Sequence, residues 1–67
     1  MNLDIGTKYH IRYRWRYSPK HKHNDFTGTY LGVHPSPAQG HLLHTFDIGG
    51  GGTFYLGTER IVSADEL

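Results

Sequence analysis

Polar and apolar residues alternate without a break over residues 8–17, KYHIRYRWRY. Every second residue is aromatic or aliphatic, and the residues between them are all basic. Because successive side chains of a strand point to opposite faces, this pattern predicts a β-strand with one apolar and one basic face. The apolar row is Tyr9, Ile11, Tyr13, Trp15 and Tyr17, and the basic row is Lys8, His10, Arg12, Arg14 and Arg16.

Shorter segments rich in aromatic and β-branched residues predict four more strands. They are residues 26–33, 41–48, 53–57 and 61–64. In the first of them, Phe26, Gly28, Tyr30 and Gly32 share one face. Two glycines on one face indicate a bend, a bulge or close packing against a large ring, for which Trp15 is the candidate.

The third and fourth strands also have an apolar face. We expect one side of residues 41–48 to present Leu42, His44, Phe46 and Ile48, and one side of residues 53–57 to present Phe54 and Leu56.

The segments between these strands are typical of loops and turns. Residues 18–25 are polar, Pro19 ends the first strand, and Asn24-Asp25 favours a turn. Residues 34–40 contain two prolines, so we expect a loop and no central strand there. Four consecutive glycines, residues 49–52, predict a tight or flexible connection. We expect one 3₁₀ turn at residues 58–60 and a frayed tail at the last three residues.

The chain has 67 residues, which predicts one small domain spanning residues 1–67. A chain of this size buries only about 60% of the surface that its unfolded form exposes. It has no cysteine for a disulfide or a thiolate metal site. Five short strands are unstable as a flat sheet with two open edges, so we expect an all-β, strongly bent sheet that closes into a small barrel.

The order of these features resembles the SH3-like and Sm-like small barrels. Those folds have a first strand, a long polar loop, a bent pair of strands, a tight hairpin, a 3₁₀ turn and a short last strand. The resemblance covers roughly residues 5–64 and rests on this layout, because neither the ALYDY-type start of peptide-binding SH3 domains nor the Asp/Asn/Gly pattern of Sm proteins is present. It therefore implies a five-stranded architecture and no functional residues. In general character the chain is also similar to short phage or accessory-genome proteins.

Charge is distributed unevenly along the chain, although the net charge is only +1. Residues 1–24 contain six of the seven Lys and Arg residues and one acid, a net charge of +5. Residues 25–67 contain Arg60 and five acids, a net charge of −4. A basic segment of this kind suits an anionic partner.

The three arginines of the basic row are the main candidate for a binding surface. Arg12, Arg14 and Arg16 are expected to form a line of guanidinium groups about 6.6 to 6.8 Å apart, and Lys20 and Lys22 extend it into the loop. Arginine suits bidentate contacts to phosphate and stacking on bases. The alternative is a solvated outer face that blocks edge pairing or is neutralised by acids of neighbouring strands. The sequence leaves both interpretations open.

The aromatic row is expected to be mostly core. We place Ile11, Tyr13 and Trp15 inside and expect Tyr9 and Tyr17, at the ends, to be partly exposed. The candidate surface aromatics are Tyr17, Tyr30 and Tyr55. A surface aromatic can stack on a base, so the candidate nucleic-acid-binding set is Arg12, Arg14, Arg16, Lys20, Lys22 and Tyr17.

No pattern indicates catalysis, a cofactor or a metal. The serines have no base and acid arranged near them in sequence, and no pair of carboxylates is recognisable. The glycine run precedes a strand, whereas a phosphate loop precedes a helix. The six histidines do not have the spacing of a ligand set. Neither a signal peptide nor a membrane span is recognisable, so we expect a non-enzymatic cytoplasmic protein.

Two functions remain. The first is a nucleic-acid-binding barrel for RNA or single strands, with low sequence specificity. The alternative is an interaction module that docks an acidic protein or self-associates into a dimer or ring, as an accessory or inhibitory factor.

Overall fold

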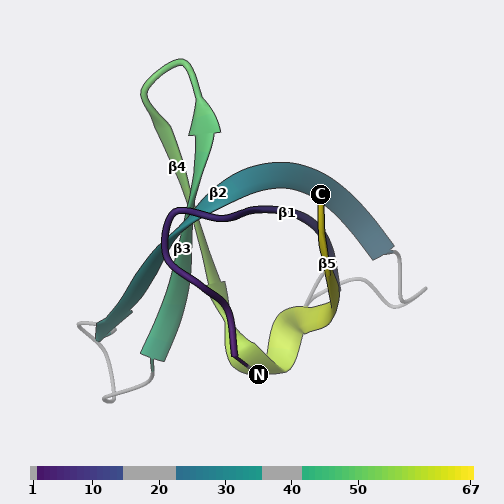
Figure 1. Cartoon of the computed structure of the whole chain (residues 1–67). Coiled ribbons are helices and arrows are strands. Elements are labelled where there is room, and N and C mark those ends of the chain that lie inside the picture. The colour runs from purple at the N-terminus through teal and green to yellow at the C-terminus, as the bar shows by residue number, and fades with distance from the viewer. Residues whose placement is uncertain (1, 15–22, 36–41) are drawn as a thin grey trace.

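The computed structural model describes residues 2–14, 23–35 and 42–67 (Figure 1). These residues form an antiparallel sheet of five strands with one 3₁₀ turn, which confirms the predicted all-β class and the turn at residues 58–60. The elements are β1 (Lys8–Arg14), β2 (His23–Pro35), β3 (Leu42–Gly49), β4 (Gly52–Gly57), η1 (Thr58–Arg60) and β5 (Ile61–Glu66). No helix within the described ranges has the length and apolar character needed to span a membrane.

The strands lie in the order β4-β3-β2-β1-β5. Strand β1 is therefore flanked by β2 and β5, and β4 and β5 form the two edges of the sheet. Strand β2 curves strongly along its length (Figure 1). The predicted bending of the sheet is present, whereas closure of its edges into a barrel stays a prediction.

A β-bulge in β2 lies where the sequence placed a bend. The register with β3 shifts between Tyr30 and Gly32, and Gly32 has a φ of 115°, a conformation that side chains other than glycine rarely adopt. At Gly28 a β-carbon would lie 3.2 Å from the ring of Phe26 and 3.1 Å from the β-carbon of Phe46. Close packing against a ring is thus confirmed at Gly28, where the ring is that of Phe26. Trp15, the expected partner, lies outside the described residues.

The core collects apolar residues from all five strands. Among the described residues it comprises Tyr9, Ile11, Tyr13, Tyr30, Phe46, Leu56 and Ile61, with Leu3, Phe26, Phe54 and Ala64 packed against it. Tyr13 and Phe54 meet edge to face at 5.2 Å between ring centroids, and Phe26 and Phe54 stack at 4.7 Å.

Two tyrosines are more buried than the sequence suggested, each with 5% of its surface exposed. Tyr30 was expected at the surface and Tyr9 partly exposed, and both expectations are wrong. Burial is possible because each hydroxyl has a partner: that of Tyr9 accepts a hydrogen bond from the Asp4 amide at 2.8 Å, and that of Tyr30 lies 2.8 Å from Nδ1 of His44. Tyr55 is 53% exposed, as expected.

Strand boundaries differ from the prediction by two or more residues at three places within the described ranges. Asn24 and Asp25 lie in β2, opposite Tyr13 and Arg12 of β1, because pairing with β1 overrides their turn preference. Strand β2 also continues to Pro35, at its end, where proline is tolerated. Strand β5 extends to Glu66, and the Leu67 amide donates to the Lys8 carbonyl at 3.1 Å, so the terminal residues do not form the expected frayed tail.

The inner face of β3 is only partly the predicted one. His44 and Phe46 are buried, but Leu42 and Ile48 are 56% and 47% exposed. Thr45, expected on the outer face, is 1% exposed, and its hydroxyl donates to the Gly32 carbonyl at 3.0 Å. Thr45 is opposite Gly32, directly after the bulge in β2, and Ile48 lies at the register shift between β3 and β4.

The glycine run forms the tight β3–β4 hairpin, as predicted. Gly50 and Gly51 connect the strands with φ values of 61° and 79°, and the preceding Gly49 also has a positive φ of 91°. Two consecutive positive φ values are typical of a type I′ turn, which matches the twist of the flanking strands. The Gly49 amide donates to the Asp47 carboxylate at 2.9 Å, which closes the base of the hairpin.

Candidate functional site

Arg12 and Arg14 are exposed on the outer face of β1, back to back with the buried residues Ile11 and Tyr13. The predicted alternation is therefore confirmed for the described part of this strand. Of the candidate nucleic-acid-binding residues, the structure brings together these two arginines. The remaining four, Arg16, Tyr17, Lys20 and Lys22, lie outside the described residues.

Acidic residues of the neighbouring strands lie beside the first half of the basic row. In the pairing register Asp25 of β2 is opposite Arg12, and Asp65 of β5 is opposite His10. His10 Nε2 lies 2.8 Å from the Asp25 carboxylate. Opposite charges across a strand pair attract, so the Lys8–Arg12 part of the row is partly neutralised. The charge asymmetry along the chain does not produce two separate faces here, because β1 lies between strands that carry acids.

The far end of β1 has different surroundings. Arg14 is opposite His23 of β2, and the pairing with β5 ends at Tyr13 and Ile61. Arg60, the last residue of η1, donates from Nε to the Arg14 carbonyl at 3.2 Å. Its guanidinium carbon lies 5.8 Å from the centre of the Tyr13 ring, within cation–π range. The structure therefore adds Arg60 to the basic residues at this end.

Sequence reasoning missed Arg60 because it is the single Lys or Arg residue of the acidic half of the chain. The only available indication was its position directly before the last predicted strand. That indication becomes informative only once this strand is known to pair with β1.

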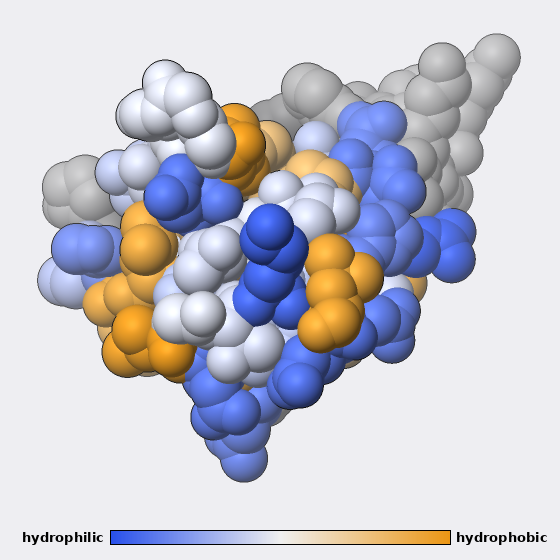
Figure 2. All heavy atoms as spheres, turned by 45° about the horizontal axis from the view of Figure 1, so that its top comes forward, coloured by the Kyte–Doolittle hydropathy of each residue, from blue (hydrophilic) through white to orange (hydrophobic). Residues whose placement is uncertain are grey.

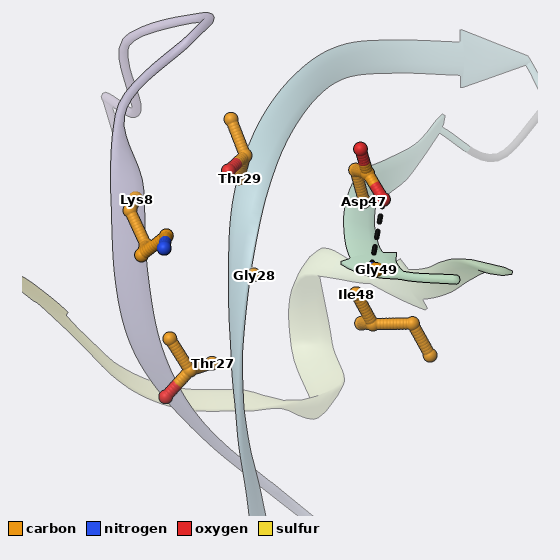
Figure 3. Close-up of a pocket in the computed structure, with 7 residues that line it drawn as sticks. All are labelled: Lys8, Thr27, Gly28, Thr29, Asp47, Ile48 and Gly49. Atoms are coloured by element: carbon orange, nitrogen blue, oxygen red, sulfur yellow. Dashed lines mark hydrogen bonds between the residues drawn. The ribbon is translucent and has the colours of Figure 1, made fainter. Parts of the chain in front are cut away.

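A shallow pocket of about 190 Å³ lies across β1, β2 and β3 (Figure 3). Lys8 and Asp47 lie in register with Thr29, one on each side of it. The pocket thus contains one positive and one negative side chain, and it does not extend the basic row toward an anion. Its lining residues are Lys8, Thr27, Gly28, Thr29, Asp47, Ile48 and Gly49.

A hydrogen-bond network centred on the buried His44 joins three elements. His44 of β3 lies 2.8 Å from the Tyr30 hydroxyl through Nδ1 and 2.9 Å from the Thr58 hydroxyl through Nε2. Burial lowers the pKa of His44 and raises the pKa of Tyr30, because it disfavours the charged form of each. Throughout the described ranges, every buried side-chain nitrogen and oxygen has a hydrogen-bond partner. We interpret the network as structural, since it attaches η1 and β2 to β3.

Comparisons of the chain with protein-family models, with curated proteins and with solved structures find no significant match.

Proposed function

We propose that the protein is a non-enzymatic module that binds the phosphate backbone of RNA or single-stranded nucleic acid with low sequence specificity. The observation that carries the proposal is the exposure of Arg12 and Arg14 on one face of a strand whose other face is core. A strand anchored by its buried face presents these side chains on a rigid support.

The chemistry of arginine supports this choice of ligand. A guanidinium group binds a phosphate through two parallel hydrogen bonds and also stacks on bases. In the proposal Arg16, Lys20 and Lys22, which follow in the sequence, complete the phosphate-binding set, and Tyr17 supplies a stacking surface. Contacts of this kind read no base edges, which gives low sequence specificity.

A salt titration tests the proposal. Fluorescence anisotropy with short labelled RNA and DNA oligonucleotides measures the dissociation constant at several salt concentrations. If about three to five phosphates are neutralised, log K falls with log[salt] with a slope of roughly −2 to −3.5 on a single strand. A flat salt dependence, or no binding to any oligonucleotide at low salt, would contradict the proposal.

Arg14→Glu should abolish this binding while the thermal unfolding midpoint stays near the wild-type value, because the side chain is exposed. Lys8→Glu is the matched control, since it changes the net charge equally at the other end of β1 and should weaken binding much less. Equal losses for the two variants would mean that net charge matters and the position of Arg14 does not.

A second candidate function is protein interaction, and the exposed apolar surface favours it. Figure 2 shows apolar residues in several separate groups on one face of the molecule. Strand β4, at one edge of the sheet, contains no charged residue, although charges commonly protect such edges. In the part of the chain that the structure describes, the exposed large apolar residues are Ile5, Leu31, Val33, Leu42, Ile48, Tyr55, Val62 and Leu67.

Two measurements separate this candidate from the first. Size-exclusion chromatography with light scattering detects a dimer or ring formed by self-association. A pull-down after nuclease treatment detects an acidic protein partner, which stays bound only if nucleic acid does not bridge the two proteins.

A further inference from the structure

Arg60 is held in place by two independent contacts. Its Nε donates to the Arg14 carbonyl, and its guanidinium lies over the Tyr13 ring. The ring is itself immobilised, because Tyr13 is 8% exposed and packs edge to face against Phe26 and Phe54. The guanidinium is therefore positioned before any ligand arrives.

These contacts leave the guanidinium suited to bind an anion. The bond to Arg14 uses one of its five N–H donors, and the two terminal Nη groups carry the other four. The N–H bonds lie in the plane of the group, and the cation–π contact with the Tyr13 ring does not use them as donors. An arginine ordered in this way loses less conformational entropy on binding than a free one.

The charges around Arg60 favour an anionic ligand at the same place. Asp65 and Glu66 of β5 lie toward the start of β1, opposite His10 and Tyr9. Asp25 of β2 is opposite Arg12, and its carboxylate lies 2.8 Å from His10 Nε2. Glu59, the neighbour of Arg60, directs its carboxylate to Gly57, where a β-carbon would lie 2.8 Å from its Oε1. Within the described ranges, the register places a histidine, His23, opposite Arg14 and no acid.

We propose that Arg60 supplies the principal phosphate-binding group of the protein, at the end of β1, and that its ligand is a phosphodiester of the bound strand. The proposal rests on the proposed nucleic-acid-binding function and names the residue that binds most tightly. It moves the centre of the interface from the middle of the basic row to the end of β1, where two segments distant in sequence meet.

The decisive comparison is between Arg60→Gln and Lys8→Gln, which each remove one positive charge. We expect Arg60→Gln to weaken oligonucleotide binding about tenfold or more, as loss of a charge-assisted contact would. It should also make the salt slope shallower by about 0.7. Lys8 lies six residues from Arg14, roughly 20 Å along the strand and beyond the Debye length, so Lys8→Gln should cost no more than about twofold.

Arg60→Lys separates binding from structure. Lysine keeps the charge but not the planar set of donors, so this variant should recover part of the affinity and most of the salt slope. Thermal unfolding of each variant is measured in the same buffer. If the only role of Arg60 is to stabilise the end of β1, Arg60→Gln and Arg60→Lys should lower the unfolding midpoint equally, and both should keep the salt slope of wild-type binding. That result would overturn the proposal.

The source of the phosphate is tested by NMR titration of the Arg60 side-chain Nε–H with an oligonucleotide and with inorganic phosphate. A shift with the oligonucleotide at lower concentration supports a phosphodiester ligand. If the Nε–H signal shifts with inorganic phosphate and no oligonucleotide binds, Arg60 is an anion-binding residue and the proposed nucleic-acid function is overturned. Oligonucleotide binding that Arg60→Gln weakens no more than Lys8→Gln overturns the Arg60 site and leaves the proposed function standing. No shift with either ligand overturns both.

Discussion

Two glycines of the sheet, Gly28 and Gly57, differ in what a β-carbon would contact. At Gly28 it would lie 3.1 Å from the Phe46 β-carbon and 3.2 Å from the Asp47 carbonyl oxygen, neither of which can move independently of the sheet. At Gly57 the nearest atoms belong to the flexible end of Glu59, and the φ and ψ of −67° and 149° suit any residue.

Gly28→Ala should therefore lower the free energy of unfolding by about 1 to 3 kcal/mol, because it overpacks the inner face of the sheet. Gly57→Ala is the matched control and should be neutral or raise the free energy of unfolding by up to about 1 kcal/mol, since alanine restricts the unfolded chain. Urea unfolding measures both. A Gly28→Ala variant as stable as Gly57→Ala would show that the sheet can shift to admit the methyl group.

The sequence predicted the burial of single residues correctly where the alternation of side chains along a strand alone decides it. Ile11, Tyr13 and the exposed Arg12 and Arg14 lie on the predicted faces. Tyr30 could not be placed from the pattern, because its burial depends on a hydrogen bond to His44 in another strand. Arg60 was missed for the same kind of reason: its contacts are to residues of β1 far away in the chain.

At the scale of elements, the β3–β4 hairpin depends on residues that adopt positive φ. Gly50 and Gly51 both do so, and asparagine is the other residue type favoured in the first position of a type I′ turn. This hairpin also sets the register of the edge strand β4 against β3.

Gly50→Asn should leave the free energy of unfolding unchanged or raise it by less than about 1 kcal/mol, because asparagine tolerates the turn and restricts the unfolded chain. Gly50→Val should lower it by about 1 to 2 kcal/mol, the cost of a left-handed conformation for such a residue. Chemical denaturation of both variants is the measurement. Equal stability of Gly50→Asn and Gly50→Val would mean that the turn is not type I′.

Element types were predicted better than element limits. The predicted strands and the 3₁₀ turn are all present in the described ranges. The early start of β2 and the late end of β5 were not predicted, because both segments are strands only through pairing with β1. Local turn preference at Asn24 and Asp25 is weaker than the hydrogen bonds of a strand pair.

At the scale of the whole molecule, the network of Tyr30, His44 and Thr58 links acid sensitivity to the fold. The pKa of His44 is lowered from its ordinary 6.5 chiefly by burial. In the unfolded chain the imidazole regains its ordinary pKa, so around pH 6 the unfolded state binds more protons than the folded state. The stabilisation from neutral His44 is therefore complete well above pH 6.5. It is lost as pH falls through 6.5 toward the lower folded value.

We expect the thermal unfolding midpoint to fall between pH 7.5 and pH 5, and His44→Gln to remove much of this dependence. Glutamine can bond to both neighbouring hydroxyls and does not titrate. The exposed His34 supplies the control, since His34→Gln should retain the wild-type dependence. Midpoints measured at several pH values for the three proteins provide the test. The same pH dependence in His44→Gln and the wild type would exclude His44 as its cause.

The sequence by itself determined the all-β class, the identity of the strands, the glycine hairpin and the two faces of β1. These follow from side-chain alternation and turn chemistry, which act between residues close in the chain. Only the tertiary structure decided that Asp25 and Asp65 lie beside the basic row, that His44 is buried against Tyr30, and that Arg60 meets Arg14. Each of these depends on which strands pair and in what register, and that register shifts between Arg12 and Tyr13 where β1 pairs with β5 and between Tyr30 and Gly32 where β2 pairs with β3.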